Sequence, residues 1–213
     1  MDESPAFNTG IGLLDKGGPV MLILLALSVV ALTIILVKIY QFSRSRLLRT
    51  EFIDQAILLL HNDGPDTTLL ALAETPHPVA RVMETTLRTS TNTSLSIEDR
   101  DTEISRVGSA EIRNLEGYLR GLEVIANLSP LLGLLGTVLG MIKAFARLES
   151  AGTKVDPAIL AGGIWEALLT TAFGLSVAIP ALAAFYILEG QVENVRAQMK
   201  DATIRVLGIL SSR

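Results

Sequence analysis

The chain has 213 residues, of which 49% are hydrophobic and only 19% charged, and its mean hydropathy is +0.46. A soluble domain usually carries about 25% charged residues, so this composition excludes a disordered chain and favours a membrane protein. The net charge of −4 gives no support to a nucleic-acid partner, and the absence of cysteine excludes disulfides and thiolate metal sites. We find no nucleotide-binding, metalloprotease or nucleophile motif, so we expect no enzyme activity, no cofactor and no metal.

The first apolar run, Val20 to Val37, contains 18 residues without a charge. At 1.5 Å per residue it would be about 27 Å long, close to the thickness of the hydrocarbon core. A signal peptide is the alternative, but it would need a positively charged start, and Asp2, Glu3 and Asp15 precede this run. We therefore expect an outer segment at 1–19 and a retained membrane span at 20–37.

Residues 38–121 are expected to form a cytoplasmic helical region. Arg44 to Leu60 has helical character and is followed by the turn formers Asn62-Asp63-Gly64-Pro65. Val79 to Leu87 predicts a second helix, and the polar cluster from Thr89 to Ser94 predicts a loop. We interpret His61 and His77, which stand beside turn formers and prolines, as solvated loop residues.

A capping pattern marks the next helix. Ser96-Ile97-Glu98-Asp99 resembles a capping box with acidic residues in the first turn, so the helix is expected to begin at Ile97. No proline occurs before Pro130, and we expect one continuous helix to Leu148, about 78 Å long. Roughly half of such a helix would project from the membrane.

Two further uncharged runs are long enough to cross a bilayer, Val124 to Ile142 with 19 residues and Ala167 to Leu188 with 22. The expected order is a second span at 122–148, a short outer loop at 149–157, a third span at 158–188 and a cytoplasmic C-terminal helix at 189–213. Because no segment has a strand period, the predicted fold class is all-α: a three-span membrane protein with two long helices that extend into a cytoplasmic helical domain.

Basic residues predict the orientation, since short cytoplasmic flanks carry an excess of lysine and arginine. They gather at one end of each span: Lys38, Arg44, Arg46, Arg49, Arg106, Arg113, Arg120, Arg196, Lys200 and Arg205. This pattern predicts an outer N-terminus and a cytoplasmic C-terminus.

Small residues recur in the second and third spans. Gly136 and Gly140 form a GxxxG pair, and Gly133 stands at the same spacing from Thr137, which lets a neighbouring helix backbone approach closely. Gly174 is expected to serve helix packing in the third span. Helix contact alone can account for this pattern. Two prolines inside apolar runs are expected to kink their helices: Pro130 and Pro180.

One carboxylate, Glu166, interrupts the uncharged stretch from Pro157 to Leu188. At about 100° per residue, Thr170 falls about 40° from Glu166 on the helix and Thr171 about 140°. Glu166, Thr170 and Gly174 therefore share a stripe that can line a polar path. An ionised carboxyl in hydrocarbon costs roughly 2.5 kcal/mol or more, so such a group can bind and release a proton as its surroundings change.

An ordinary interfacial position is the alternative for Glu166. Trp165 and Tyr186 are about 31 Å apart along a helix, the spacing of two aromatic belts, and Glu166 would then lie at the outer interface. Lys143 and Arg147, near a helix end, are interpreted as interfacial anchors.

Two segments, Ser129 to Ile142 and Gly162 to Leu175, continued by Ala178-Ile179-Pro180-Ala181, resemble the signature segments of the MotA/TolQ/ExbB proton-channel family. Three spans and a large first cytoplasmic region resemble the ExbB/TolQ branch rather than the four-span MotA stators. The resemblance implies a bacterial inner-membrane ion-channel motor subunit. Such a subunit uses the proton gradient to energise a partner that acts on the cell envelope or on outer-membrane transport.

The same resemblance implies partners and site residues. The partners would be further copies of the chain in a homopentamer, an ExbD- or TolR-like single-span protein, a TonB- or TolA-like protein and the lipid bilayer. By position, the pore threonine matches Thr137, the pore glutamate Glu166, and the threonine five residues later Thr171. Because the helical wheel places Thr170 on the face of Glu166, both threonines remain candidates. The alternatives are a TolQ-like or gliding-type motor with another output, and a non-conducting oligomeric membrane scaffold.

Overall fold

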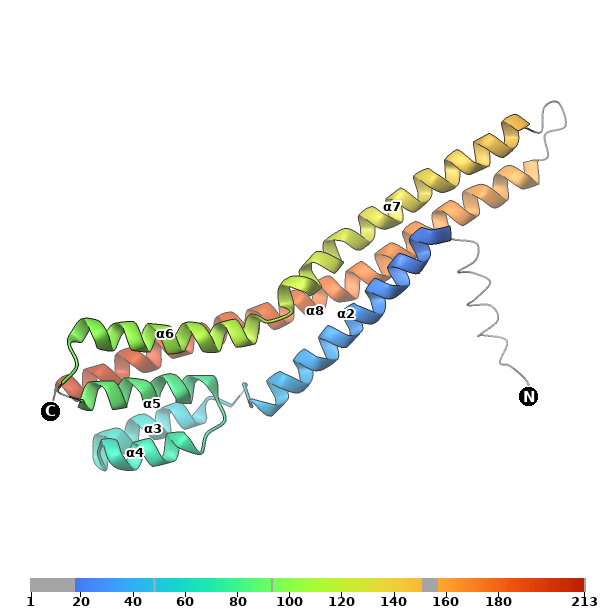
Figure 1. Ribbon diagram of the computed structural model, residues 1–213. Helices are drawn as coiled ribbons and strands as arrows, with labels where there is room; N and C mark the ends of the chain where they lie inside the picture. The colour runs from blue at the N-terminus through green and yellow to red at the C-terminus, as the bar shows by residue number, and fades with distance from the viewer. Residues whose placement is uncertain (1–17, 48, 93, 151–156, 213) are drawn as a thin grey trace, which may run out of the picture. The chain divides into compact units, whose positions relative to one another are not determined.

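The computed structural model describes residues 18–47, 49–92, 94–150 and 157–212, and these residues form seven α-helices (Figure 1). The all-α prediction is therefore confirmed. The chain packs as two units: one comprises the described parts of residues 1–35 and 120–185, the other those of 36–119 and 186–213. The expected outer N-terminal segment lies outside the described residues up to residue 17, and the expected outer loop lies outside them at 151–156.

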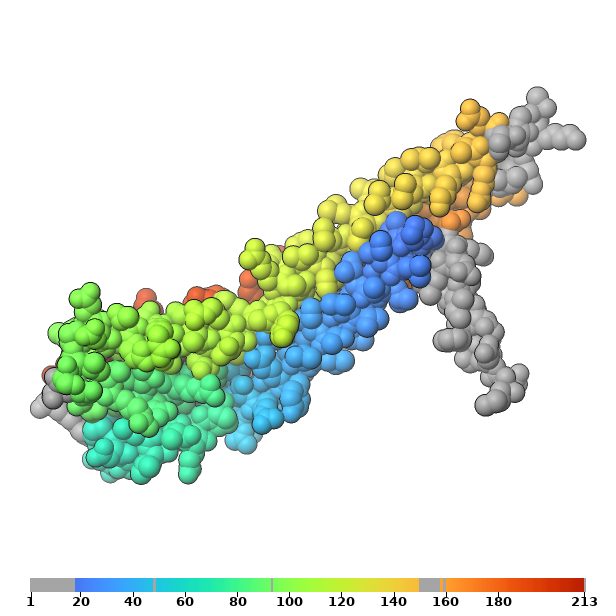
Figure 2. Space-filling model, viewed as in Figure 1, coloured from blue at the N-terminus to red at the C-terminus, as the bar shows by residue number. Residues whose placement is uncertain are grey.

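The first unit contains the apolar parts of three helices: α2 (Gly18–Arg44), α7 (Leu119–Ser150) and α8 (Pro157–Ser211). Each includes a stretch long and apolar enough to cross a membrane, which confirms the three-span prediction. In Figure 2 the atoms of α2 lie along α7, and a Cβ built on Gly121 of α7 would lie 3.8 Å from the Cδ1 of Ile34. Many large apolar side chains of these helices face outward; for example, Leu131 is 60% exposed. Such a surface suits a lipid environment.

The second unit contains α3 (Glu51–Asn62), α4 (Pro65–Ala73), α5 (Pro78–Thr91), α6 (Ile97–Glu116) and the C-terminal part of α8. Its core consists of large side chains that water cannot reach, including Leu60, Met83, Leu87, Val195 and Val206. This packing of amphipathic helices around an apolar core is the ordinary way in which helices are stabilised in water.

Two of the predicted helix boundaries are confirmed. Ser96 is the N-cap of α6, and its hydroxyl accepts a hydrogen bond from the Asp99 backbone N–H at 3.1 Å. The helix α3 ends at Asn62, and Pro65 occupies the first turn of α4.

The predicted helix from Arg44 to Leu60 is wrong in its first part. α2 ends at Arg44, and α3 does not begin until Glu51. Between them Arg46 has a φ of +48°, which turns the chain so that Leu47 is only 4% exposed. Burial of an apolar side chain therefore outweighs the local preference for helix.

The loop predicted from Thr89 to Ser94 begins too early, because α5 continues to Thr91. The threonine hydroxyls donate back to helical carbonyls one turn earlier, as Thr89 does to Thr85 at 2.9 Å and Thr91 to Leu87 at 2.9 Å. These bonds let a polar cluster remain helical.

The expected continuous helix from Ile97 to Leu148 is also wrong. α6 ends at Glu116 and α7 begins at Leu119, and between them Tyr118 has a φ of +66°. A left-handed backbone costs a residue with a side chain about 1–2 kcal/mol, so tertiary contacts must compensate at this position.

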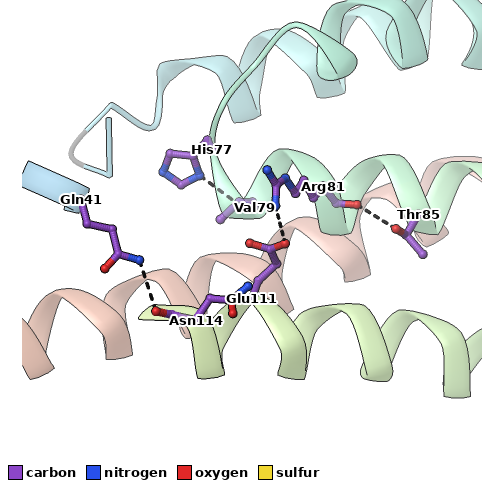
Figure 3. Close-up of polar contacts among 7 residues, drawn as sticks. All are labelled: Gln41, His77, Val79, Arg81, Thr85, Glu111 and Asn114. Carbon is purple, nitrogen blue, oxygen red and sulfur yellow. Dashed lines mark hydrogen bonds and ion pairs between the residues drawn. The ribbon is translucent and has the colours of Figure 1, made fainter. Parts of the chain in front are cut away.

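His77 is not a solvated loop residue, as the sequence suggested, but is only 2% exposed. It is the N-cap of α5, and its Nδ1 accepts a hydrogen bond from the Val79 backbone N–H at 3.1 Å (Figure 3). The ring centroid lies 4.8 Å from that of Phe52. Desolvation lowers the pKa of His77 below its ordinary value of 6.5, and the nearby carbonyl of Leu47 opposes this shift. Neutral imidazole is thus a structural element of this unit.

Candidate functional site

The contact between α7 and α8 in the first unit, which we call the seam, is built from small residues that lie directly against backbone atoms or short side chains of the facing helix. A Cβ on Gly136 would lie 2.6 Å from the Thr170 Oγ1, and a Cβ on Gly174 would lie 2.6 Å from the Ser129 carbonyl oxygen. A Cβ on Gly133 would lie 3.0 Å from the Thr171 Cα. These separations leave no room for a larger side chain at any of the three glycines.

The seam extends beyond the glycines that the sequence singled out. A Cβ on Gly140 would lie 2.9 Å from the Ala167 Cβ, and one on Gly163 would lie 2.5 Å from the Ala144 Cβ. Gly163, Ala144 and Ala167 were not candidates in the sequence. The small-xxx-small spacing from Gly136 through Gly140 to Ala144 could have identified Ala144.

The two threonines of α8 lie on this seam. Thr170 is 1% exposed and its hydroxyl donates to the Ala167 carbonyl at 2.7 Å. Thr171 donates across the seam to the Gly133 carbonyl at 3.0 Å. This bond links α8 to α7, so Thr171 contributes to the helix contact whatever further role it has.

Glu166 is half-buried in a small pocket of about 40 Å³ that all three helices of the first unit line. Thr170 and Lys143 share this pocket with it. The remaining lining is apolar or small: Gly18, Pro19, Val20, Gly136, Leu139 and Gly140. The pocket thus combines a carboxyl, an amine and a hydroxyl with walls that carry few polar groups. In such a low-dielectric setting, a change in the charge of one group strongly changes its interaction energy with the others.

Thr137 lies on a different surface of α7. It is half-buried, its hydroxyl donates to the Leu134 carbonyl at 2.6 Å, and it lines an open groove with Val138, Met141, Ile142, Phe145, Ala146 and Glu149. The structure of the single chain therefore brings Thr170 to Glu166 and places Thr137 on a separate groove.

The two prolines lie where the sequence placed them, Pro130 inside α7 and Pro180 inside α8. Next to Pro130, Ser129 is fully buried and its hydroxyl donates to the Ile125 carbonyl at 2.7 Å. This bond satisfies the buried hydroxyl of Ser129 within its own helix.

Metal ligands are not grouped in the part of the chain that the structure describes. Among these residues no three histidine, aspartate or glutamate side chains are close enough to hold an ion together. The pocket at Glu166 holds one carboxylate.

The chain matches the model of the MotA/TolQ/ExbB proton channel family over residues 74–201. It belongs to this family. The matched residues include the whole α7–α8 seam and Glu166. Together with three membrane-length helices, membership makes the chain a multi-pass inner-membrane protein of a proton-channel family.

Curated relatives identify the ExbB/TolQ branch of the family. A putative biopolymer transport protein ExbB homolog of Methanothermobacter thermautotrophicus is 28% identical over 189 residues, which cover 88% of this chain and 66% of that protein. The biopolymer transport protein ExbB of Pseudomonas putida is 35% identical over 108 residues, 51% of this chain and 32% of that protein. The Tol-Pal system protein TolQ of Haemophilus influenzae is 41% identical over 85 residues, 40% of this chain and 37% of that protein. The chain thus spans less than two thirds of the length of these three relatives.

Proposed function

We infer that the chain is the ion-conducting subunit of an ExbB/TolQ-type motor, with Glu166 as the proton-carrying acid. The observation that supports this most directly is the position of Glu166: it shares a three-helix pocket with Thr170 and Lys143, within the part of the chain that matches the family. A carboxyl that faces only apolar residues would be costly to ionise, whereas one that shares a pocket with an amine and a hydroxyl can exchange a proton.

The threonines would serve the ion path in different ways. Thr170 shares the pocket with Glu166, and because its hydroxyl proton is donated to Ala167, its oxygen would act as an acceptor toward the protonated carboxyl. Thr171 fixes α8 against α7 through its bond to Gly133. Thr137, on its separate groove, would face a second polypeptide and line the path only in an assembly. Each 100 mV across the membrane makes about 2.3 kcal/mol available for every charge that crosses, which is the energy such a motor would use.

We further infer the assembly from family resemblance: a homopentamer with an ExbD- or TolR-like single-span partner, which transmits energy to a TonB- or TolA-like protein. The relatives named as biopolymer transport and Tol-Pal proteins support an output at the cell envelope. The N-terminus would lie outside and the C-terminus in the cytoplasm. Because the chain has no cysteine, a single cysteine at Ser109 tests this orientation. An impermeant maleimide should label it in lysed cells and not in intact cells, and labelling of intact cells would reverse the topology.

The function is tested by replacing the carboxyl. In proteoliposomes that contain the protein and its partner, Glu166→Gln should lower proton flux about 100-fold, because the amide keeps the shape and cannot exchange a proton, while Glu166→Asp should retain part of the flux. Glu189→Gln, at an exposed position on the same helix, is the matched control and should conduct normally. Unchanged flux in Glu166→Gln, in a complex of normal size, would instead favour the non-conducting scaffold.

A further inference from the structure

Gly117 and Tyr118 form the joint between α6 and α7, and this joint has an unusual pattern of hydrogen bonds. The last helical bond of α6 is donated by the Gly117 N–H to the Arg113 carbonyl, at 3.0 Å. In an uninterrupted helix, the next two N–H groups, of Tyr118 and Leu119, would donate to the carbonyls of Asn114 and Leu115. At the joint these two carbonyls accept hydrogen bonds from side chains of another helix.

Both of these donors come from the end of α2. The Lys38 Nζ donates to the Leu115 carbonyl at 2.8 Å, and the Gln41 Nε2 donates to the Asn114 carbonyl at 3.2 Å (Figure 3 shows the second bond). Lys38 and Gln41 are three residues apart, so they share one face of α2. We call this pair the α2 clamp. Its two donors occupy the positions of the two backbone donors that a continuous helix would supply.

The α2 clamp is a connected network. Lys38 also donates to the Gln41 Oε1 at 2.9 Å, which orients the amide so that its nitrogen faces Asn114. The Lys38 side chain is fully buried, with its Nζ 5.8 Å from the centre of the Phe42 ring. The ammonium also lies at the negative end of the α6 dipole, where a cation is favoured.

Because Lys38 is buried, a change in the α6 carbonyls that it bonds to also requires a change in the position of α2. If α6 and α7 joined as one helix, the carbonyls of Asn114 and Leu115 would point along the helix axis to the N–H groups of Tyr118 and Leu119, and the added helical turn would take the place of the two side-chain donors. A carbonyl oxygen has a second lone pair, so this displacement, and not the loss of an acceptor, is what moves the α2 clamp. The end of α2 would then have to move so that the ammonium reached water. The position of α2 and the conformation of the joint are therefore linked.

Apart from Gly117, the local sequence is compatible with the helix that the α2 clamp prevents. No proline interrupts the chain from Ile97 to Ser129, and Tyr118 adopts a left-handed backbone that a residue with a side chain rarely takes. Gly117 weakens the helix locally, and the α2 clamp adds two hydrogen bonds that hold the joint broken.

We propose that the α2 clamp is a conformational latch with two states. With Lys38 and Gln41 bound to the carbonyls of α6, the joint is broken at Gly117 and Tyr118. With the end of α2 withdrawn, the same carbonyls bind the N–H groups of Tyr118 and Leu119, and α6 and α7 form one helix. Each state satisfies the two carbonyls, and a displacement of α2 exchanges one state for the other.

Backbone hydrogen exchange of the full-length protein in lipid nanodiscs tests the latch, because the Tyr118 and Leu119 amides are helix-bonded only in the continuous state. Lys38→Met removes the donor and keeps an apolar stem, and should slow exchange of these two amides about tenfold. Lys38→Arg, which keeps a cationic donor, is the matched control and should remain within about threefold of the wild type. Unchanged or faster exchange in Lys38→Met would overturn the proposal.

A second variant leaves the clamp intact, so the test does not depend on the folding of Lys38→Met. Gly117→Ala raises helix propensity at the joint, and its Cβ would lie at an ordinary 3.4 Å from the Asn114 carbonyl oxygen. It should slow exchange at Tyr118 and Leu119 and, through the linkage, raise the rate at which a water-soluble acetylating reagent modifies Lys38 about fivefold. Slower exchange without increased modification of Lys38 would show that joint and clamp are not linked, and would overturn the latch.

Discussion

The two units of the chain differ in how their own helices pack together. In the first unit, glycines and alanines of α7 and α8 meet with backbone atoms close enough that no larger side chain fits, as at Gly174 and the Ser129 carbonyl. In the second unit, large side chains such as Leu60, Met83 and Val195 fill a core from which water is excluded. Many large apolar side chains of the first unit face outward, as Leu131 does, whereas those that form the core of the second unit face inward.

The difference follows from the solvent. In water, burying apolar area supplies the stabilising free energy, so helices gain by presenting large apolar faces to one another. In lipid the surroundings are as apolar as leucine, and helices associate through close packing and hydrogen bonds. Shortening a buried side chain should therefore destabilise the second unit, and replacing a glycine of the helix contact by a larger residue should destabilise the first.

The largest effect is expected from truncation in the second unit. Met83 is fully buried, so Met83→Ala should lower the stability of this unit by about 2–5 kcal/mol through lost burial and a cavity. Hydrogen exchange of α5 amides would measure the loss. Leu70→Ala, at a position 73% exposed, is the control and should change stability by less than about 0.5 kcal/mol. Equal effects of both substitutions would show that this core does not carry the stability of the unit.

An intermediate effect is expected from enlargement in the first unit. In Gly174→Leu the new Cβ would meet the Ser129 carbonyl oxygen at 2.6 Å, and backbone cannot rotate away, so the seam should lose about 1–3 kcal/mol. Gly162→Leu is the matched control on the same helix, since a Cβ there meets nothing within 4 Å. Resistance to denaturation in detergent, followed by native mass analysis, compares the two. A stable Gly174→Leu protein would contradict close packing as the source of stability.

The smallest effect concerns pH. Burial lowers the pKa of His77 in the folded protein below its ordinary value of 6.5, so between these two pKa values the unfolded chain binds more protons than the folded one. Stability from this group is fully present above about pH 6.5 and is lost as the pH falls through the folded-state pKa. Exchange of α5 amides should therefore be faster at pH 5.5 than at pH 7.5 after correction for the intrinsic rate. His77→Asn, which keeps a capping acceptor, should remove this difference, and a difference that persists would assign the pH dependence to another group.

Local signals predicted much of the fold correctly. The cap at Ser96 and the turn at Pro65 depend on a few adjacent residues, so both can be predicted from the sequence. The interruption at Tyr118 and the burial of His77 were missed, because both involve contacts with residues distant in the chain. Lys38 and Gln41 bond to carbonyls just before Tyr118, and the ring of His77 packs on Phe52.

The candidate site shows the same division. The spacing of Gly136 and Gly140 and the isolated charge of Glu166 identified the residues, but Gly163, Ala144 and Lys143 joined them only in the folded chain. The helical wheel placed Thr170 on the face of Glu166, and both line one pocket. It could not show that the Thr171 hydroxyl bonds to Gly133 on another helix.

The amino-acid sequence by itself determined three membrane-length helices, an all-α fold and the isolated acid in the third span, because hydrophobicity and helical period act over neighbouring residues. The tertiary structure decided where the helices break, which small residues touch, and that Glu166 shares a pocket with Lys143. Those features depend on which side chain satisfies which backbone group across the fold, and a carbonyl such as that of Leu115 can accept a donor from its own helix or from another. Only packing selects between them.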